Sequence, residues 1–540
     1  MKAMLRLLAI AGRAQAGWLL LGLISSLIAT LIAVGLSGSA GAVFAGGTLL
    51  AVPLLLRVLG PLRVIARYAE RMLTHDALFR ALADLRVWFF RRVAERMAGG
   101  LGMYRAGDLL ARLVGDVEAQ DAVYMRVMLP LIGAIALLPI LAFVLGWIDL
   151  RLAIIVCLLF MLCAFVLPWF AMQGALANGS SLAQAMAGLR VTALDAVTGL
   201  REVRAFAAEG RMLAATQARE SALLTAQSRA MRRIAWAGAG AFLAAQAAIL
   251  ATLLLGRDHG ATAITLVFVV IAAFEAVSLL PRAGAQAGMS AAAAERVLAI
   301  TESPIPCPDP PQPAPMPAAF GLRIENVCFR WQDDRPPVFD GLSLEIPQGT
   351  RIALLGPSGI GKSTLAALCL RLAAPQEGRI LLGRVDIATL AVAELRQQIG
   401  WLSQATHLFD DTIRNNLLIA RPDASDVELW DALERAQIAA EVRALPEGLE
   451  TYLGEGGIGF SGGQGRRLAL ARVLLSPAKL LILDEPCAGL DAETERQFLT
   501  TLNQTMEGRS TILIAHHLTG VEKLDRIYRL SAGRAVAAAG

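Results

Sequence analysis

The segment 356–364 reads GPSGIGKST, and it directly follows the apolar run RIALL at 351–355. Glycines in such a segment let backbone N–H groups converge on phosphate oxygens, and a helix that begins there adds the positive end of its dipole. The lysine of this motif reaches the β and γ phosphates, and the hydroxyl after it ligates Mg²⁺. The pattern therefore predicts a strand, a nucleotide-binding loop and a helix. The residues expected to bind nucleotide are Gly356, Ser358, Gly359, Gly361, Lys362, Ser363 and Thr364, with Ser363 on the metal.

A second apolar run, LLILD at 480–484, is followed directly by another acidic residue, Glu485. An unbroken run of this kind is typical of a buried parallel strand. A carboxylate at the end of such a strand, here Asp484, is placed to hold the Mg²⁺ of a bound nucleotide. Glu485 is placed to polarise the attacking water, so we expect it to be the general base of hydrolysis.

These motifs, in this order, resemble the nucleotide-binding domain of ABC transporters over the region 320–530. The resemblance implies that Trp331 stacks on adenine, that Gln404 links Mg²⁺ to the membrane domain, and that His516 contacts the γ-phosphate. It also assigns a signature motif, in which Ser461, Gly462, Gly463 and Gln464 cap the γ-phosphate of ATP held by a second subunit, and a D-loop aspartate, Asp491.

Three positions depart from the usual pattern of that family. Phe460 stands where leucine is commoner, Arg466 where a second glutamine is usual, and His517 where arginine is frequent. None of them removes a catalytic group. Because the signature acts on a second nucleotide-binding domain, the resemblance implies that the chain works as one half of a pair.

The chain is too apolar for an ordinary soluble protein, with 56% hydrophobic and 18% charged residues. Roughly 20 apolar residues span a bilayer, and six such segments can be drawn in the first part of the chain. The connections after the second and fourth are long, helical and rich in arginine, which predicts that they and both termini are cytoplasmic. They also explain the net charge of +5 without nucleic-acid binding. The six expected spans are 17–35, 42–62, 127–147, 152–171, 234–255 and 261–281.

The stretch 303–318 reads SPIPCPDPPQPAPMPA and is expected to be too stiff and polar to pack as part of a core. It would join a transmembrane domain at 1–302 to an ABC nucleotide-binding domain at 319–540. The predicted fold class is a polytopic α-helical membrane domain of six helices, similar to type IV ABC exporters, fused to an α/β P-loop ATPase domain. The six cysteines show no CxxC spacing and are expected to be reduced thiols.

Charged residues recur every four positions at the end of the second expected span, as Arg63, Arg67, Arg71 and His75. That spacing places them along one slowly rotating helix face, where contact with lipid would be costly. Two interpretations stay open. The helix has already left the bilayer and its arginines are solvated or paired with nearby acids, or the face is the cationic wall of an internal cavity. In the second case Glu275, an acid inside an apolar segment, faces the same cavity.

A cationic wall that ends in histidine suits an anionic ligand that contains a metal, because imidazole ligates haem iron and guanidinium groups pair with propionates. The segments RYAERMLTHDALFR at 67–80, LRVWFF at 85–90 and GEGG at 454–457 resemble the CydC family, one subunit of the CydDC exporters required for cytochrome bd assembly. In that family the substrate has been argued to be haem, or thiols such as glutathione and cysteine. If it is haem b, the resemblance maps the iron ligand onto His75.

The expectation is therefore an ATP- and Mg²⁺-dependent half-transporter of the bacterial inner membrane, paired with a homologous CydD-like partner and moving haem. Its candidate substrate residues are Arg67, Arg71, His75 and Glu275. The alternatives are an exporter of cysteine or glutathione, a mainly regulatory ATP-binding subunit, and a lipid or peptide exporter.

Overall fold

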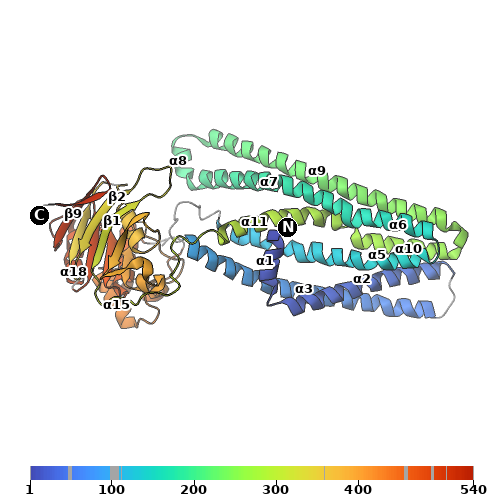
Figure 1. Ribbon diagram of the computed structural model, residues 1–540, viewed down its shortest axis with the longest axis horizontal. Coiled ribbons are helices and arrows are strands. Elements are labelled where there is room, and N and C mark those ends of the chain that lie inside the picture. Colours follow the sequence, from blue (N-terminus) through green and yellow to red (C-terminus); the bar gives the residue numbers. More distant parts are fainter. Residues whose placement is uncertain are drawn as a thin grey trace. The chain divides into compact units, whose positions relative to one another are not determined.

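The computed structural model describes residues 2–46, 51–97, 109–110, 112–357, 359–404, 406–454, 460–487, 492–505 and 508–538. These residues fall into two compact units (Figure 1). A helical unit contains the described residues up to 96 and from 109 to 303, and an α/β unit contains those from 304 onward. Each unit is described by itself below.

The helical unit consists of long helices that lie side by side (Figure 1). Helices α3, α7 and α9 each extend beyond an apolar stretch into a more polar segment, which agrees with the helical connections expected from the sequence, and the polar segments of α3 and α9 are rich in arginine. The helices are α1 (Lys2–Gly12), α2 (Ala16–Phe44), α3 (Ala51–Met97), α5 (Leu129–Gly146), α6 (Leu150–Met161), α7 (Leu167–Thr198), α8 (Leu200–Ala205), α9 (Glu209–Gly256), α10 (Ala261–Val277) and α11 (Leu280–Thr301). Shorter helical segments are η1 (Arg112–Asp116), η2 (Val123–Met128), η3 (Leu162–Val166) and η4 (Arg257–His259).

Among the described residues, five stretches are long and apolar enough to cross a membrane: Ala16–Phe44, Val123–Gly146, Leu150–Leu176, Glu209–His259 and Ala261–Thr301. They contain four of the six expected spans in full, and a fifth, 127–147, except for its last residue. The second expected span, 42–62, was wrong in its boundaries. Its first residues belong to α2, which extends to Phe44, and residues 51–62 belong to α3, where Arg57 interrupts the apolar sequence.

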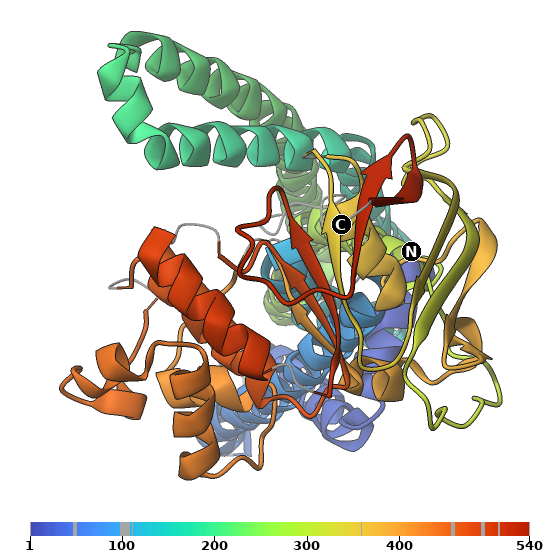
Figure 2. The ribbon, with the colours of Figure 1, turned by 90° about the vertical axis from the view of Figure 1, so that its left-hand side faces the viewer.

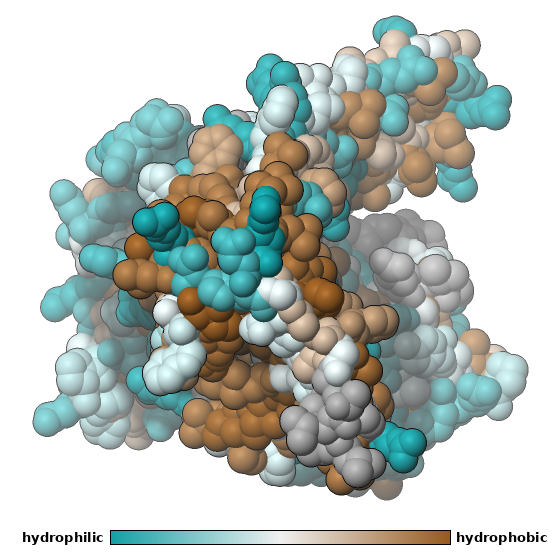
Figure 3. Space-filling model, turned by 90° about the vertical axis from the view of Figure 1, so that its right-hand side faces the viewer, coloured by the Kyte–Doolittle hydropathy of each residue, from teal (hydrophilic) through white to brown (hydrophobic). Residues whose placement is uncertain are grey.

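The surface of the helical unit is apolar at the end that carries the α5–α6 and α9–α10 connections. Figure 3 shows that a small hydrophilic group there is surrounded by hydrophobic side chains. Phe143, Trp147 and Leu150 near the α5–α6 connection are 69%, 82% and 68% exposed. Large apolar side chains left outside a core are expected where lipid replaces water.

Helices α7 and α11 approach closely because α11 presents small residues. A Cβ added to Gly284 would lie 2.0 Å from the carbonyl oxygen of Pro168, and one added to Gly288 would lie 2.7 Å from Cβ of Ala175. Small residues four positions apart are the usual means by which membrane helices pack this closely. The contact holds α11 in place, and this helix contributes Arg282 to the cavity described below.

The α/β unit contains two sheets. In the six-stranded sheet, ordered β10-β9-β3-β8-β7-β6, the strands from β9 to β6 are parallel, and the antiparallel four-stranded sheet has the order β2-β1-β4-β5. The apolar run before the phosphate loop forms β3 and the run before Glu485 forms β7, both with buried centres. The strands are β1 (Leu322–Phe329), β2 (Phe339–Ile346), β3 (Arg351–Leu355), β4 (Glu377–Leu382), β5 (Val385–Asp386), β6 (Ile399–Leu402), β7 (Leu480–Asp484), β8 (Ser510–Ala515), β9 (Arg526–Ser531) and β10 (Arg534–Ala538).

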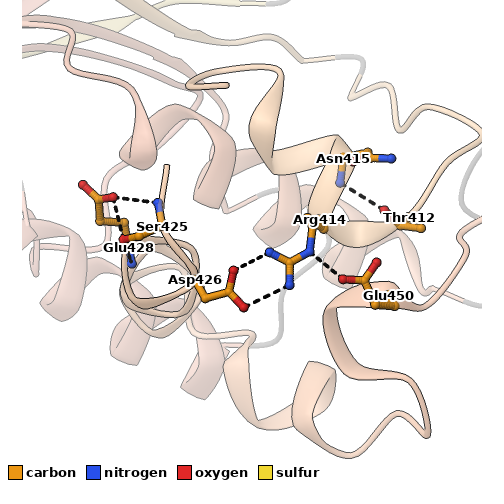
Figure 4. Close-up of polar contacts among 7 residues, drawn as sticks. All are labelled: Thr412, Arg414, Asn415, Ser425, Asp426, Glu428 and Glu450. Carbon is orange, nitrogen blue, oxygen red and sulfur yellow. Dashed lines mark hydrogen bonds and ion pairs between the residues drawn. The ribbon is translucent and has the colours of Figure 1, made fainter. Parts of the chain in front are cut away.

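A group of helices in this unit packs around a second apolar core, and Figure 2 shows the orange helices of this group to one side of the strands. Arg414 on α14 connects this helix to α15 and η6, because its guanidinium donates hydrogen bonds to both carboxylate oxygens of Asp426 and to one carboxylate oxygen of Glu450 (Figure 4). The helices of the unit are α12 (Lys362–Cys369), α13 (Val392–Gln397), α14 (Ile413–Leu418), α15 (Asp426–Arg435), α16 (Ala439–Arg443), α17 (Gly462–Leu475) and α18 (Ala492–Thr505), with short turns η5 (Ile387–Thr389) and η6 (Gly448–Glu450).

The proline-rich stretch does pack, contrary to the sequence-based expectation. Arg371, which is 6% exposed, donates to the carbonyl oxygens of Pro308 at 2.8 Å and Leu390 at 2.5 Å. Further along, Ala314 pairs with Leu390 as an isolated bridge and contacts the core of the sheets. The prediction from composition was wrong because the buried guanidinium of Arg371 supplies a hydrogen bond that the proline-rich backbone cannot make to itself.

Candidate nucleotide site and substrate cavity

The phosphate loop connects β3 to α12, as the sequence predicted. Gly359 and Gly361 have φ of +81° and +109°, which side chains rarely tolerate. A Cβ on Gly361 would also lie 2.4 Å from Cγ1 of Val338. Gly356 begins the loop directly after β3, and Ser358 lies outside the described residues.

Lys362, Ser363 and Asp484 meet at the start of α12. The Lys362 ammonium, on a side chain that is almost fully buried, donates to the carbonyl oxygen of Gly356 at 2.5 Å, inside the phosphate loop. The Ser363 hydroxyl donates to Asp484 Oδ2 at 2.7 Å. Burial raises the pKa of the Asp484 carboxyl, and the Ser363 hydroxyl and the nearby cations oppose that rise.

This arrangement fits Mg²⁺, because a hydroxyl and a buried carboxylate at hydrogen-bonding distance are hard oxygen ligands that a cation can bring together. Ser363 and Asp484 would hold the ion, which when bound neutralises charge on the phosphates. Lys362 is positioned in the same loop to pair with those phosphates.

Glu485 is held by three groups at the tip of β7. Its backbone lies in the left-handed region with φ of +49°, and its N–H donates to the carbonyl of Ile514 at 2.8 Å. One carboxylate oxygen lies 2.7 Å from Nε2 of His516, and the other accepts from Gln404 Nε2 at 3.2 Å. Strained backbone of this kind costs about 1–3 kcal/mol and persists where the surroundings enforce it. Glu485, predicted from its place after the apolar run, therefore lies together with Gln404 and His516, which the family resemblance assigned.

Trp331 follows β1 and is 42% exposed. Its indole N–H donates to the Thr364 hydroxyl at 3.2 Å, and its ring packs edge-on against Phe329. The hydrogen bond ties the expected adenine-stacking residue to the helix that follows the phosphate loop.

The signature segment forms the start of α17. Ser461 and Gln464 make a reciprocal capping box, in which each side chain bonds the backbone N–H of the other. Gly462 and Gly463 form the first turn between them. The sequence reading missed this local role, although a serine followed three residues later by glutamine is the pattern for it. Asp491 and residues 455–457 lie outside the described residues.

The helical unit contains a cavity of about 1020 Å³. It is lined from α2, α3, the η2–α5 segment, α10 and α11, and its charged lining comprises Arg63, Arg67, Glu70, Arg71, Arg126, Glu275 and Arg282. Arg67 pairs with Glu70 at 3.3 Å, and Glu70 also accepts from the Ser26 hydroxyl at 3.0 Å. Within the described residues, the side chains of Arg63, Arg71, Arg126, Glu275 and Arg282 have no ion pair or hydrogen bond.

A smaller chamber of about 380 Å³ shares Arg67 and Arg71 with the cavity and adds His75, Thr74 and Asp121. His75 is exposed and lies 5.7 Å from the ring of Phe79. Of the four expected substrate residues, three therefore line the large cavity and His75 lines the chamber beside it. Both interpretations of this face of α3 stay open, because Arg67 and Arg71 line the cavity and Arg67 also pairs with a nearby acid, Glu70.

Sequence reasoning missed three charged residues of the cavity, Glu70, Arg126 and Arg282. Arg126 and Arg282 are lone cations beside apolar runs, in VYMRVMLP and LLPRAG. A rule that flags such charges as functional would have found both.

Comparison with known proteins agrees with both units. Residues 339–488 match the family model described as "ABC transporter". The chain is 33% identical to the "Glutathione/L-cysteine transport system ATP-binding/permease protein CydC" of Escherichia coli (strain K12), covering 99% of this chain and 96% of that protein. It is 28% identical to the corresponding CydD protein of Bacillus subtilis (strain 168), over 90% of this chain and 86% of that protein. Its fold is similar to the "Structure of a bacterial Atm1-family ABC exporter with ATP bound", with 25% identity, a TM-score of 0.84 and coverage of 97% and 94% of the two chains.

A helical membrane unit of exporter type, followed by an ATPase unit with this phosphate loop and these carboxylates, defines half of an ABC exporter, which couples ATP hydrolysis to transport. The match to the Escherichia coli CydC protein covers nearly the whole of both chains, so it identifies the family as well as the class. The chain belongs to the CydC family of these half-transporters.

Proposed function

We propose that this half-transporter exports small thiol compounds of the glutathione and cysteine class, as part of a heterodimer with a CydD-like partner in the bacterial inner membrane. The observation that carries the proposal is the mixed charge of the cavity, which has five arginines and two glutamates in its lining. The names of the CydC and CydD relatives support the substrate class and the pairing.

The charges of the cavity match the charges of these compounds. Glutathione carries two carboxylates and one ammonium group, and cysteine carries one of each. Unpaired guanidinium groups such as Arg71, Arg126 and Arg282 suit the carboxylates. Glu275, the acid of the cavity that has no partner within the described residues, suits the ammonium. Unpaired charges inside a membrane unit are expensive, so they favour a ligand that neutralises them.

The test measures stimulation of ATP hydrolysis by glutathione, cysteine and N-acetylcysteine in the purified pair. N-acetylcysteine keeps the thiol and carboxylate but lacks the ammonium, so it isolates the role of Glu275. We expect Glu275→Gln to raise the half-stimulating concentration of glutathione and cysteine by about tenfold, as for one lost charge-assisted hydrogen bond, and to leave the response to N-acetylcysteine unchanged. Glu220→Gln, an exposed site on α9 away from the cavity, is the matched control. Equal shifts for all three compounds would contradict the ammonium assignment.

Haem b is the second candidate substrate, and its transport would then serve cytochrome bd assembly. The observation in its favour is that His75 shares a chamber with Arg67, Arg71 and Arg126, so the chamber offers one imidazole and three guanidinium groups. If haem is the ligand, His75→Ala should abolish the Soret shift of added haem, and His259→Ala in η4 should not. A shift that persists in His75→Ala would remove His75 as the iron ligand.

Two other functions stay as alternatives with less support. A lipid exporter would also use arginines for phosphate, but a lone acid such as Glu275 would oppose it. A regulatory ATP-binding subunit would not need the contacts that hold Glu485, since a site that never hydrolyses ATP has no use for an oriented base.

A further inference from the structure

We propose that Arg466 is a positioning residue for ATP hydrolysis, which ties the loop carrying Gln404 to the strand end carrying Glu485. Arg466 lies in the second turn of α17 and is 7% exposed. Its two terminal nitrogens bond two different segments: Nη1 donates to the carbonyl oxygen of Gln404 at 2.8 Å, and Nη2 donates to the carbonyl oxygen of Asp484 at 2.5 Å.

The two carbonyls belong to residues whose functional groups must keep a fixed spacing. The Gln404 side chain lies 3.2 Å from the carboxylate of Glu485, the residue that follows Asp484. Because the guanidinium is planar and rigid, one side chain sets the distance between the two backbones. Arg466 therefore acts through Gln404 and Glu485 and does not itself reach the reacting atoms.

Keeping a guanidinium at this depth is costly. Burial lowers the pKa of Arg466, while the charges of Glu485 and Asp484 oppose that change. Its Nε is buried without a hydrogen-bond partner within the described residues. A buried cation with an unsatisfied N–H is not expected to be present for stability alone, since an apolar side chain of similar size often stabilises a core equally well. What an apolar side chain could not replace are the two hydrogen bonds to the carbonyl oxygens of Gln404 and Asp484.

The placement of Arg466 on α17 extends the coupling to the signature motif. Ser461 and Gln464 cap the same helix, within two turns of Arg466. A shift of this helix when the signature engages a nucleotide on the partner would be passed through Arg466 to both Gln404 and the end of β7. One guanidinium thus joins the three elements on which hydrolysis depends.

The neighbouring residue provides a matched control. Arg467 is on the same helix, but it bonds the carbonyl of Gln437 and pairs with Glu441 at 2.8 Å, in the helical part of the unit. Arg467→Gln removes a similar amount of hydrogen bonding from α17 without touching Gln404 or Asp484.

The test uses the full-length heterodimer and photolabelling with 8-azido-ATP, in which this chain is separated from its partner on a gel. For Arg466→Gln, we expect labelling of this chain without Mg²⁺ to remain within twofold of wild type. We expect vanadate trapping on this chain to fall by about tenfold and to need several-fold more Mg²⁺, because Gln404 and Glu485 lose their common tether. Arg466→Lys keeps the charge but not the fork, and should give an intermediate value.

Arg467→Gln should lower the melting temperature without changing the Mg²⁺ requirement of trapping. The proposal is overturned if Arg466→Gln traps nucleotide with the wild-type Mg²⁺ requirement, or loses trapping only in proportion to the loss of folded complex. If Arg466→Gln does not fold, Arg466→Lys decides: a wild-type Mg²⁺ requirement in that folded variant also overturns it.

Discussion

Replacing Glu485 with glutamine should abolish ATP turnover at the site built on this chain while leaving ATP bound. The carboxylate is held between His516 and Gln404 on a strained backbone, so its position is enforced and not accidental. Loss of a general base lowers a rate by roughly 10²- to 10⁴-fold. The amide of glutamine keeps nearly the same shape and can still bond Gln404. The measurement is vanadate trapping and hydrolysis rate in the paired complex, together with nucleotide occupancy on this chain.

The matched control for that experiment is Glu447→Gln at the start of η6, an exposed acid that makes no hydrogen bond or ion pair with Glu485, Gln404 or His516. Trapping on this chain that is unaffected by Glu485→Gln, with occupancy also unchanged, would show that another group activates water. Lower occupancy would instead assign Glu485 to binding.

Replacing Ser461 with arginine should silence the nucleotide site of the partner while sparing this chain's own phosphate loop. The serine caps α17 through its hydroxyl, and the resemblance to ABC ATPases assigns it to ATP held by the second subunit. Arginine removes the helix cap, which lowers stability, and it adds bulk at the start of the helix, which blocks contact with the partner's nucleotide. The cap alone is worth about 1 kcal/mol. Hydrolysis that depends on the partner's nucleotide should therefore fall by more than tenfold.

Ser425→Arg separates the two losses, because Ser425 forms the same kind of capping box on α15 (Figure 4). It should destabilise the unit to a similar degree and leave hydrolysis per folded complex intact. If Ser461→Arg reduced labelling of this chain and spared the partner's hydrolysis, the signature would act on its own subunit and the paired arrangement would be wrong.

The placement of the phosphate loop and of the two carboxylates could be predicted from the sequence because each of these parts is encoded locally. A strand, a glycine-rich loop and a helix follow each other in sequence, and the carboxylates stand at the end of one apolar run. The sequence analysis missed the local capping box of Ser461 and Gln464 and, for a different reason, the long-range contacts. The bond of Arg466 to Gln404 joins residues 62 positions apart, and sequence alone showed merely an arginine at an unusual position.

The cavity was predicted less completely because its lining comes from separate helices. The arginines of α3 stood out by their spacing, but Arg126 and Arg282 come from other elements and have no periodic pattern. The ion pair of Arg67 with Glu70 agrees with one of the two interpretations left open by the sequence, in which these arginines pair with nearby acids. Which charged residues line the cavity depends on how these helices pack together, and the sequence of each helix alone does not show this.

ATP-driven uptake of radiolabelled glutathione into proteoliposomes tests directly whether this half-transporter and its partner export small thiols. The paired complex is reconstituted, and ATP is added outside so that only transporters with outward-facing ATPase domains work. We expect that the wild-type pair accumulates glutathione, that Glu485→Gln reduces accumulation, and that Arg71→Glu combined with Arg126→Glu abolishes accumulation while basal ATP hydrolysis continues. A wild-type pair that hydrolyses ATP but accumulates no glutathione, or a charge-reversed pair that accumulates it normally, would contradict thiol export through this cavity.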